Sequence, residues 1–189
     1  ARLAAGDEDG RLPSHLRSLL ADLTSLAAIG TIADVVPLED ENRMIAAWGL
    51  RHIAQCRIPG VEALLQVANL DNKRQLTAME VGFRLGPRLN AVGRLGKADA
   101  AVELLCTSDR NRAESLAVAL DEVNQERQEL TKRMAQEAEA MAVANGFDQD
   151  DRRCVILCGD DWHPGVVGIV ASRMVERFGR PAILLSRED

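Results

Sequence analysis

The chain has 189 residues, of which 47% are hydrophobic, so it can bury a core large enough for one ordinary domain or two small ones. Its net charge of -6 excludes a nucleic-acid coat held by overall positive charge, so any site for a polyanion must be local. Aromatic residues make up only 3% of the chain, which disfavours binding by base stacking and favours contacts to phosphates.

Hydrophobic periodicity predicts a helical first part. Leucines at helical spacing after Pro13 indicate a helix over residues 13–28, which runs into an apolar β-branched stretch closed by Pro37. An acidic first turn predicts a second helix over residues 39–56. Three shorter helices are expected over residues 60–70, 77–85 and 97–107; the middle one carries a Thr77–Glu80 capping box and is expected to stop at Gly86 and Pro87.

One long helix is predicted from Asp109 to Ala144, ended by Gly146. Its charged sequence contains a narrow seam with residues three and four apart, formed by Leu116, Leu120, Val123, Arg127, Leu130, Met134, Ala138 and Met141. The seam fits either a coiled-coil surface for a partner or a connecting helix packed along its own protein. Arg127 interrupts the seam, which favours the connecting helix.

The last part reads as strand, helix and strand, in the segments RRCVILCG, PGVVGIVASRMVERFG and RPAILLS. The helix is expected to begin at Pro164 or Gly165, and a right-handed crossover makes the two strands parallel. We therefore expect an α/β protein with a helical part over residues 1–108, a connecting helix over 109–146 and an incomplete α/β domain over 147–189. Two strands cannot complete such a domain, so we expect the chain to be a piece of a longer protein.

The four cysteines, Cys56, Cys106, Cys154 and Cys158, form no repeated CxxC pair, which predicts buried free thiols rather than zinc ligands or disulfides. No segment resembles a signal peptide, and we identify no apolar run near the roughly 20 residues of a membrane span. A cytoplasmic protein without membrane contact is expected.

Asp34 lies in the apolar sequence GTIADVVP, where burying a carboxylate costs free energy unless it is paired, hydrogen-bonded or bound to a metal ion. The residues alone favour a turn-capping Asp at the end of a strand, ahead of Pro37. A metal ligand is the alternative, although no Asp or His cluster surrounds this position in the sequence.

Residues 82–97, GFRLGPRLNAVGRLGK, contain the positive side chains Arg84, Arg88, Arg94 and Lys97 and no carboxylate. Glycines allow close backbone approach to a ligand, and in a helix Asn90 and Arg94 would lie one turn apart, a spacing that suits two donors to one phosphate. A flexible linker with solvated arginines fits the composition equally well.

The loop GDDWHPGVVG joins the first C-terminal strand to its helix, at a place where α/β folds bind anions. His163 and the Gly165 N–H are the natural contacts there, whereas Ser172 and Arg173 would reach only a ligand that extends along the helix. A structural turn residue is at least as good an interpretation of His163.

Three blocks in register, GTIADVVPLEDENR, LGPRLNAVGRLG and WHPGVVGIVASRMVERFGRP, closely resemble the RecJ exonucleases of the DHH phosphoesterase superfamily from about Leu23 onward. The resemblance implies the helical C-terminal part of a DHH domain, a long connecting helix and the first βαβ unit of a DHHA1 domain. It also implies 5′ to 3′ degradation of single-stranded DNA in repair and recombination with Mn²⁺ or Mg²⁺, and it suggests a helicase and a single-strand binding protein as partners.

Residue by residue, the resemblance makes Asp34 a metal ligand, which replaces the turn-cap interpretation, and makes Asn90 and Arg94 the pair that holds the phosphate at the cleaved bond. Asp34 and Arg94 are then the catalytic residues. Further phosphate contacts are expected from Arg88, and contacts to the end of the strand from His163, Ser172 and Arg173.

The Asp-x-Asp and Asp-His-His motifs of the superfamily are absent and are expected before residue 1, and the glycine-rich DHHA1 motif is expected after Asp189. The chain alone is therefore expected to be inactive. Two alternatives remain open: a DHH-family phosphodiesterase acting on short RNA or cyclic dinucleotides, and a non-catalytic RecJ-like replication scaffold. Retention of Asp34, Asn90 and Arg94 argues against the scaffold.

Overall fold

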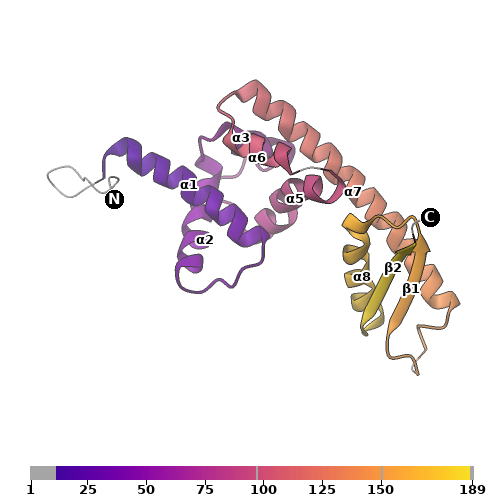
Figure 1. Ribbon diagram of the computed structural model, residues 1–189. Coiled ribbons are helices and arrows are strands. Elements are labelled where there is room, and N and C mark those ends of the chain that lie inside the picture. Colours follow the sequence, from indigo (N-terminus) through magenta and orange to yellow (C-terminus); the bar gives the residue numbers. More distant parts are fainter. Residues whose placement is uncertain (1–11, 97, 150, 188–189) are drawn as a thin grey trace. The chain divides into compact units, whose positions relative to one another are not determined.

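The computed structural model describes residues 12–96, 98–149 and 151–187, which form two compact units. The first unit contains the chain up to Asn90 together with Ala98–Asp121, and the second contains Ala91–Lys97 and Glu122–Asp189. Helices α5 (Gly86–Leu95) and α7 (Arg110–Ala144), which are labelled in Figure 1, each contribute residues to both units. The division into residues 1–108, 109–146 and 147–189 stays a prediction.

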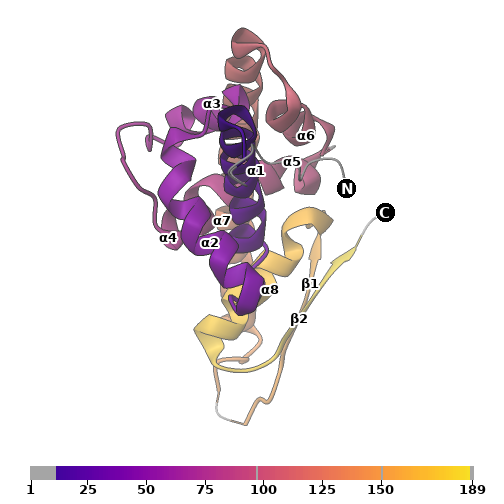
Figure 2. The same ribbon diagram turned by 90° about the vertical axis from the view of Figure 1, so that its left-hand side faces the viewer.

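The first unit is helical, and α1 (Ser14–Ala33) and α2 (Asp40–His52) pack side by side in it (Figure 2). Its core is built from fully buried apolar side chains such as Ile53, Leu64 and Leu104. The other elements are a 3₁₀ turn (Ile53–Gln55), α3 (Pro59–Val67), α4 (Ala78–Glu80), a π-helix (Val81–Leu85) and α6 (Asp99–Cys106).

Helix α1 is longer than the sequence indicated, because the β-branched stretch after residue 28 continues the helix to Ala33. Ser25, Ala28, Ile29 and Ile32 repeat at helical spacing and are the buried residues of α1. Asp34 therefore follows a helix, and the expectation that it ends a strand was wrong. Helical periodicity outweighed the β preference of the threonine and isoleucines.

The segment from Ala78 to Leu95 is continuous helical backbone, capped by Thr77. The capping box is confirmed, since the Glu80 N–H donates to the Thr77 hydroxyl at 3.2 Å and the Thr77 N–H donates to the Glu80 carboxylate at 2.9 Å. The expected stop at Gly86 and Pro87 was wrong: a π-helical turn lets the Gly86 N–H donate to the Val81 carbonyl, and Pro87 falls in the first turn of α5.

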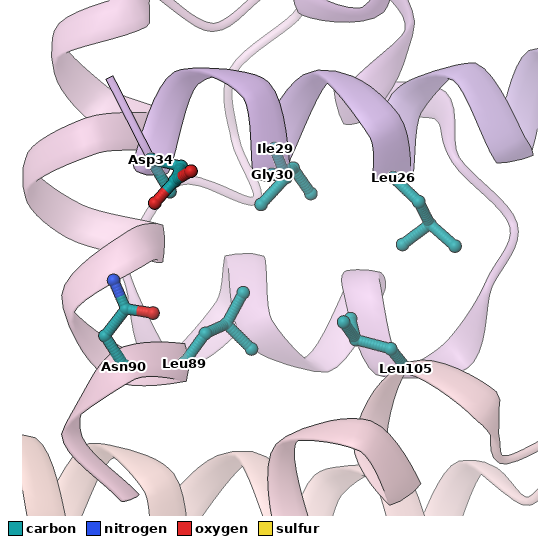
Figure 3. Close-up of a pocket in the computed structure, with 8 residues that line it drawn as sticks. Leu26, Ile29, Gly30, Asp34, Leu89, Asn90 and Leu105 are labelled. Carbon is teal, nitrogen blue, oxygen red and sulfur yellow. The ribbon is translucent and has the colours of Figure 1, made fainter. Parts of the chain in front are cut away.

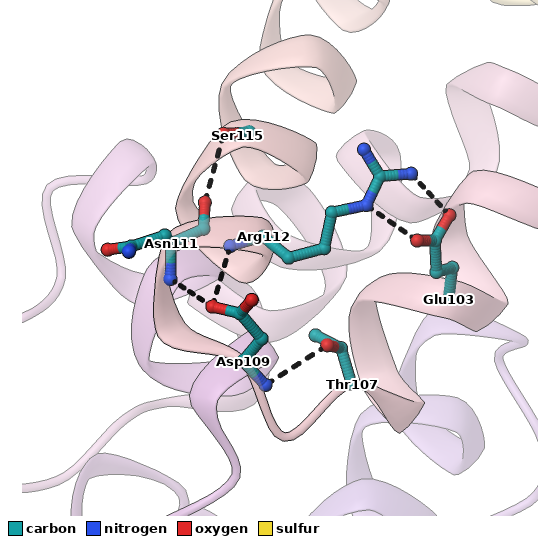
Figure 4. A network of polar contacts seen from close by, with 6 residues as sticks. All are labelled: Glu103, Thr107, Asp109, Asn111, Arg112 and Ser115. Carbon is teal, nitrogen blue, oxygen red and sulfur yellow. Dashed lines mark hydrogen bonds and ion pairs between the residues drawn. The ribbon is translucent and has the colours of Figure 1, made fainter.

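A polar network fixes the start of α7 (Figure 4). One Asp109 carboxylate oxygen accepts the N–H groups of Asn111 at 2.9 Å and Arg112 at 3.3 Å, as an N-cap does. The Arg112 guanidinium also donates twice to Glu103 on α6, at 2.6 and 2.8 Å. These contacts explain why the long helix begins directly after Asp109.

Helix α7 packs along its own chain, which agrees with the favoured interpretation of its seam. The buried residues of its middle and C-terminal parts include Leu120, Asn124, Thr131, Met134 and Ala138. In the second unit the apolar residues of α7 join a core with β1 (Val155–Asp160) and α8 (Pro164–Phe178).

The predicted βαβ unit is confirmed. β1 pairs in parallel with β2 (Ala182–Arg187), and α8 begins at Pro164 between them. Val155 and Leu157 face the helices, whereas Ile156, Ile183 and Leu185 on the opposite face are about half exposed (52%, 49% and 51%). The fold class is therefore α/β, as the sequence predicted.

All four cysteines are free thiols, but only Cys56 is buried, and burial raises its pKa to about 11. Cys106 and Cys158 are exposed, so the expectation of buried thiols was wrong for these two.

Helix α1 is long and apolar enough to cross a membrane, by length and composition only, although no such run was expected from the sequence. Such a result from one helix is weak evidence, because core helices of globular proteins pass the same test.

The capping box gives the helix that leads to α5 a pH-dependent stability. The Lys73 ammonium group, and then the hydrogen bond from the Thr77 N–H, lower the pKa of Glu80 from 4.5 to about 2. A depressed carboxyl pKa contributes stability above the unfolded pKa and loses it as the pH falls toward the folded pKa.

We expect Glu80→Gln, which keeps a capping-box side chain but removes the charge, to lower the free energy of unfolding at pH 7 by less than about 1 kcal/mol. The difference from wild type should shrink as the pH falls from 4.5 toward 2. Urea unfolding across this range measures it, with Glu126→Gln, at an exposed position in the middle of α7, as control. A difference that stays constant down to pH 3 would contradict the assignment.

Candidate functional site

Asp34 lies in a strained turn at the end of α1. The Val35 N–H donates to the Ile32 carbonyl and the Val36 N–H to the Thr31 carbonyl, both at 3.2 Å, which is the Schellman pattern. Val35 occupies the left-handed position that usually takes glycine (φ 55), and such strain in a β-branched residue is typical of functional turns. Backbone groups alone close this turn, so the Asp34 carboxylate is not its cap.

The Asp34 side chain is exposed and borders an open pocket of about 250 Å³ in the first unit. Figure 3 shows the Asn90 amide pointing toward the Asp34 carboxylate at one end of this pocket. The rest of the lining is mostly apolar and comprises Leu26, Ile29, Gly30, Ala33, Leu89 and Leu105. The pocket therefore combines one carboxylate and one amide with an apolar wall.

Close packing of two helices places Asn90 beside Asp34. A Cβ atom on Gly86 would lie 2.9 Å from the Cβ of Ala33, so the first turn of α5 approaches the last turn of α1 more closely than a larger residue would allow. Asn90 lies one turn after Gly86 on α5, and Asp34 is the residue directly after Ala33. The contact between Gly86 and Ala33 therefore brings Asn90 close to Asp34. Residues 90–94 are helical, so Asn90 and Arg94 lie one turn apart, which is the case in which the sequence suits two donors to one phosphate.

In the second unit, Arg94 is held against the first turn of α8. Its guanidinium donates to the Gly165 carbonyl at 3.2 Å, and its side chain remains exposed. A Cβ atom on Gly165 would lie 2.1 Å from the Arg94 carbonyl oxygen, so no side chain fits between the two segments. Glycine at position 165 is therefore a condition for this contact.

His163 is the N-cap of α8, and its Nδ1 accepts the Gly165 N–H at 3.0 Å. The Gly165 N–H, which the sequence suggested as an anion contact, is thus already paired within the protein. His163 has the structural role that the sequence left open, with Nε2 as the ring nitrogen available to a ligand. Ser172 and Arg173 are exposed on α8, and the Ser172 hydroxyl donates to the Gly168 carbonyl at 3.1 Å.

Arg88 and Arg84 serve the fold of the first unit. Arg88 pairs with Asp121 at 2.8 Å and donates to the Arg84 and Val67 carbonyls at 2.6 and 3.3 Å. Arg84 donates to the Ala68 carbonyl, so both arginines bind carbonyls at the end of α3. Because these contacts use the Arg88 guanidinium within the protein, they argue against the expected contact between Arg88 and a phosphate. Lys97 lies outside the described residues.

Asp34 is the only expected metal ligand. Within the described residues, no group of three or more His, Cys, Asp or Glu side chains could hold a metal ion. Asp34 fits a hard divalent cation as one oxygen ligand, because its carboxylate is exposed and makes no hydrogen bond within the described part of the chain. The other donors would have to come from outside these residues.

No family model matches the chain. Over 92% of its length it is 45% identical to the single-stranded-DNA-specific exonuclease RecJ of Bacillus subtilis, of which it covers 22%. It is also 43% identical, over 87% of its length, to the enzyme of the same name from Escherichia coli, of which it covers 29%. The chain thus spans about a quarter of the length of these relatives.

Solved structures give the same result. The crystal structure of RecJ from Thermus thermophilus in complex with Mn²⁺ matches 95% of the chain with a TM-score of 0.78 and 35% identity, and the chain covers 25% of it. The complex of that protein with Mg²⁺ matches with a TM-score of 0.76, again at 35% identity and 95% coverage, and the chain covers 26% of it.

The contact between Gly165 and Arg94 predicts opposite effects for two neighbouring glycines of α8. Gly165→Ala should lower the free energy of unfolding by about 1–3 kcal/mol, because the added methyl group overlaps the Arg94 carbonyl. Gly168→Ala, where no atom lies within 4 Å of the new Cβ, should be neutral or stabilise the helix by up to about 1 kcal/mol. Urea unfolding measures both, and equal effects would show that the close contact is absent.

Proposed function

We propose that this chain, which belongs to the RecJ family and spans a segment of its members, forms part of a metal-dependent exonuclease that degrades single-stranded DNA from 5′ to 3′ in the cytoplasm. The main supporting observation is the pocket that Asp34 and Asn90 both line. The relatives that the chain resembles are named single-stranded-DNA-specific exonucleases. Repair and recombination are the processes that this activity would serve. A helicase and a single-strand binding protein would be its natural partners, since they generate and protect single strands.

We assign the metal contact of this chain to Asp34. Its carboxylate is exposed at one end of the pocket, directly before the strained turn at Val35. A bound Mn²⁺ or Mg²⁺ ion supplies charge neutralisation at the phosphate and acidifies a water molecule. The remaining ligands belong to parts of the longer protein, and the chain alone is inactive in this account.

The phosphate at the cleaved bond is bound by Asn90 and Arg94 of α5. The Asn90 amide and the Arg94 guanidinium project from one face of this helix, one turn apart, and a guanidinium makes strong charge-assisted bonds to phosphate oxygens. Arg94 is exposed and has a neutral carbonyl as its protein partner, so its charge remains for the substrate. It stabilises the charge that develops on the phosphate in the transition state.

The end of the DNA strand is held by α8. Arg173 and the Ser172 hydroxyl are exposed on this helix, and the free Nε2 of His163 lies at its start. His163 also caps α8, and the Ser172 hydroxyl also donates to a helix carbonyl. Arg173 is therefore the residue of these three that offers a positive charge to the DNA. Retention of Asp34, Asn90 and Arg94, all with exposed side chains, favours an enzyme over a non-catalytic scaffold.

In the longer protein, Asp34→Asn is expected to raise the Mn²⁺ concentration that gives half-maximal exonuclease activity by about tenfold or more, because a neutral amide is a weaker ligand than a carboxylate. The exposed Glu41→Gln on α2 is the matched control, and it should leave the metal titration unchanged. A metal titration of Asp34→Asn that coincides with wild type would remove Asp34 from the metal site.

Arg94→Ala should lower kcat for a 5′-phosphorylated single strand by about 100-fold or more, as the loss of an electrostatic transition-state contact does. Its unfolding free energy should change by less than about 1 kcal/mol, because the side chain is exposed. Gly93→Ala on the same helix, with no atom within 4 Å of its new Cβ, is the control for folding. A strongly destabilised variant with normal turnover would show that Arg94 is structural.

A further inference from the structure

The connecting helix α7 carries a polar section in the middle of its buried face. Asn124 and Thr131 are 1% and 0% exposed, and Arg127 lies between them on the same face, one turn from each. Apolar residues precede and follow this section, namely Leu120 and Met134. An arginine at such a position needs a reason, because a partly buried charge costs free energy unless it is paired.

The contacts of Arg127 orient its guanidinium but leave its charge uncompensated. Its Nη2 donates to the Oδ1 of Asn124 at 2.7 Å, and its carbonyl accepts the Thr131 hydroxyl at 2.6 Å. Asn124 is a neutral amide, and no carboxylate pairs with Arg127 in the described part of the chain. Other arginines of the same unit do have acidic partners: Arg177 pairs with Glu139 at 2.7 Å, and Arg187 with Asp160 at 2.6 Å.

Two further guanidinium groups lie near Arg127. Burial first, and then the charges of Arg94 on α5 and Arg173 on α8, lower the pKa of Arg127. Neither Arg94 nor Arg173 has an ion pair among the described residues, and both are exposed. Three helices of the second unit thus bring three unpaired positive charges together, an arrangement that is unfavourable until an anion joins it.

We propose that Arg127 is a phosphate-binding residue, which grips the DNA backbone together with Arg94 and Arg173 while buried Asn124 holds its guanidinium in position. This inference rests on the proposed function and adds to it a residue from the connecting helix. DNA is the anion that fits best, because successive phosphodiesters offer one negative charge to each of several guanidinium groups. The connecting helix is then part of the DNA-binding surface as well as a link between domains.

The salt dependence of DNA binding tests the proposal. The probe is a fluorescent, 5′-phosphorylated single strand of thymidines, bound by the longer protein in EDTA, which prevents cleavage. Loss of one phosphate contact lowers the slope of log K against log salt by about 0.7 for single strands. We expect this change, with about tenfold weaker binding, for Arg127→Gln. Arg133→Gln, which removes an exposed charge from the same helix, should keep the wild-type slope.

Two additions keep the test decisive if Arg127→Gln unfolds. Arg127→Lys retains the charge and should keep the wild-type slope. In the wild-type protein, phenylglyoxal should modify Arg127 when DNA is absent, and bound DNA should protect it, as read by mass spectrometry of its peptide. Equal modification with and without DNA, or a slope for Arg127→Gln equal to that of Arg133→Gln, overturns the proposal.

These outcomes separate the two proposals. If wild-type protein does not bind the single strand, both the proposed function and the role of Arg127 are refuted. If wild-type protein binds and degrades the strand with a normal salt slope, and only the Arg127 results fail, the exonuclease stands and Arg127 is a structural residue of α7.

Discussion

The close packing of α5 at glycine positions is the constraint on which the candidate site depends. At its first residue, α5 meets the end of α1, where Gly86 leaves no room for a larger side chain beside Ala33. At its last turn, the Arg94 backbone meets Gly165 at the start of α8. The first contact brings Asn90 to Asp34, and the second fixes Arg94. Steric repulsion at these distances excludes an added methyl group, so helix packing determines where the polar groups lie.

Arginines on and around α5 differ in what their side chains contact. Arg84 and Arg88 use their donors on carbonyls at the end of α3 and on Asp121, and so they stabilise the first unit. Arg94, Arg127 and Arg173 lack acidic partners in the described residues. An acidic protein can bind a polyanion in this way, because unpaired guanidinium groups gathered at one place act locally whereas the net charge acts at long range.

Sequence patterns predicted the parts of the fold that depend on periodicity and on local caps. These include the βαβ unit, the long α7 with its seam and the Thr77 capping box, because each arises from residues close in sequence.

Other features could not be predicted in this way. Gly86 and Pro87 were misread as a helix end, since a π-helical turn that accommodates them has no sequence signature of its own. The pairing of Arg88 with Asp121, and of His163 with the Gly165 N–H, required the fold. The assignment of Asp34 as a metal ligand came from resemblance to a family rather than from spacing, and it stays a prediction; the turn around Val35 is closed by backbone groups and does not use the Asp34 carboxylate. Arg127 was visible only as an interruption of the seam.

In the proposed site, α5 presents a phosphate to a metal ion bound by Asp34. A crystal structure of the longer protein with Mn²⁺ and a short 5′-phosphorylated DNA strand tests it most directly, with the metal located by its anomalous scattering. We expect a manganese ion about 2.1 Å from an Asp34 carboxylate oxygen and a phosphate within about 3 Å of both the Asn90 amide and the Arg94 guanidinium. A manganese ion without Asp34 among its ligands, or a strand whose phosphates avoid Asn90 and Arg94, would contradict it.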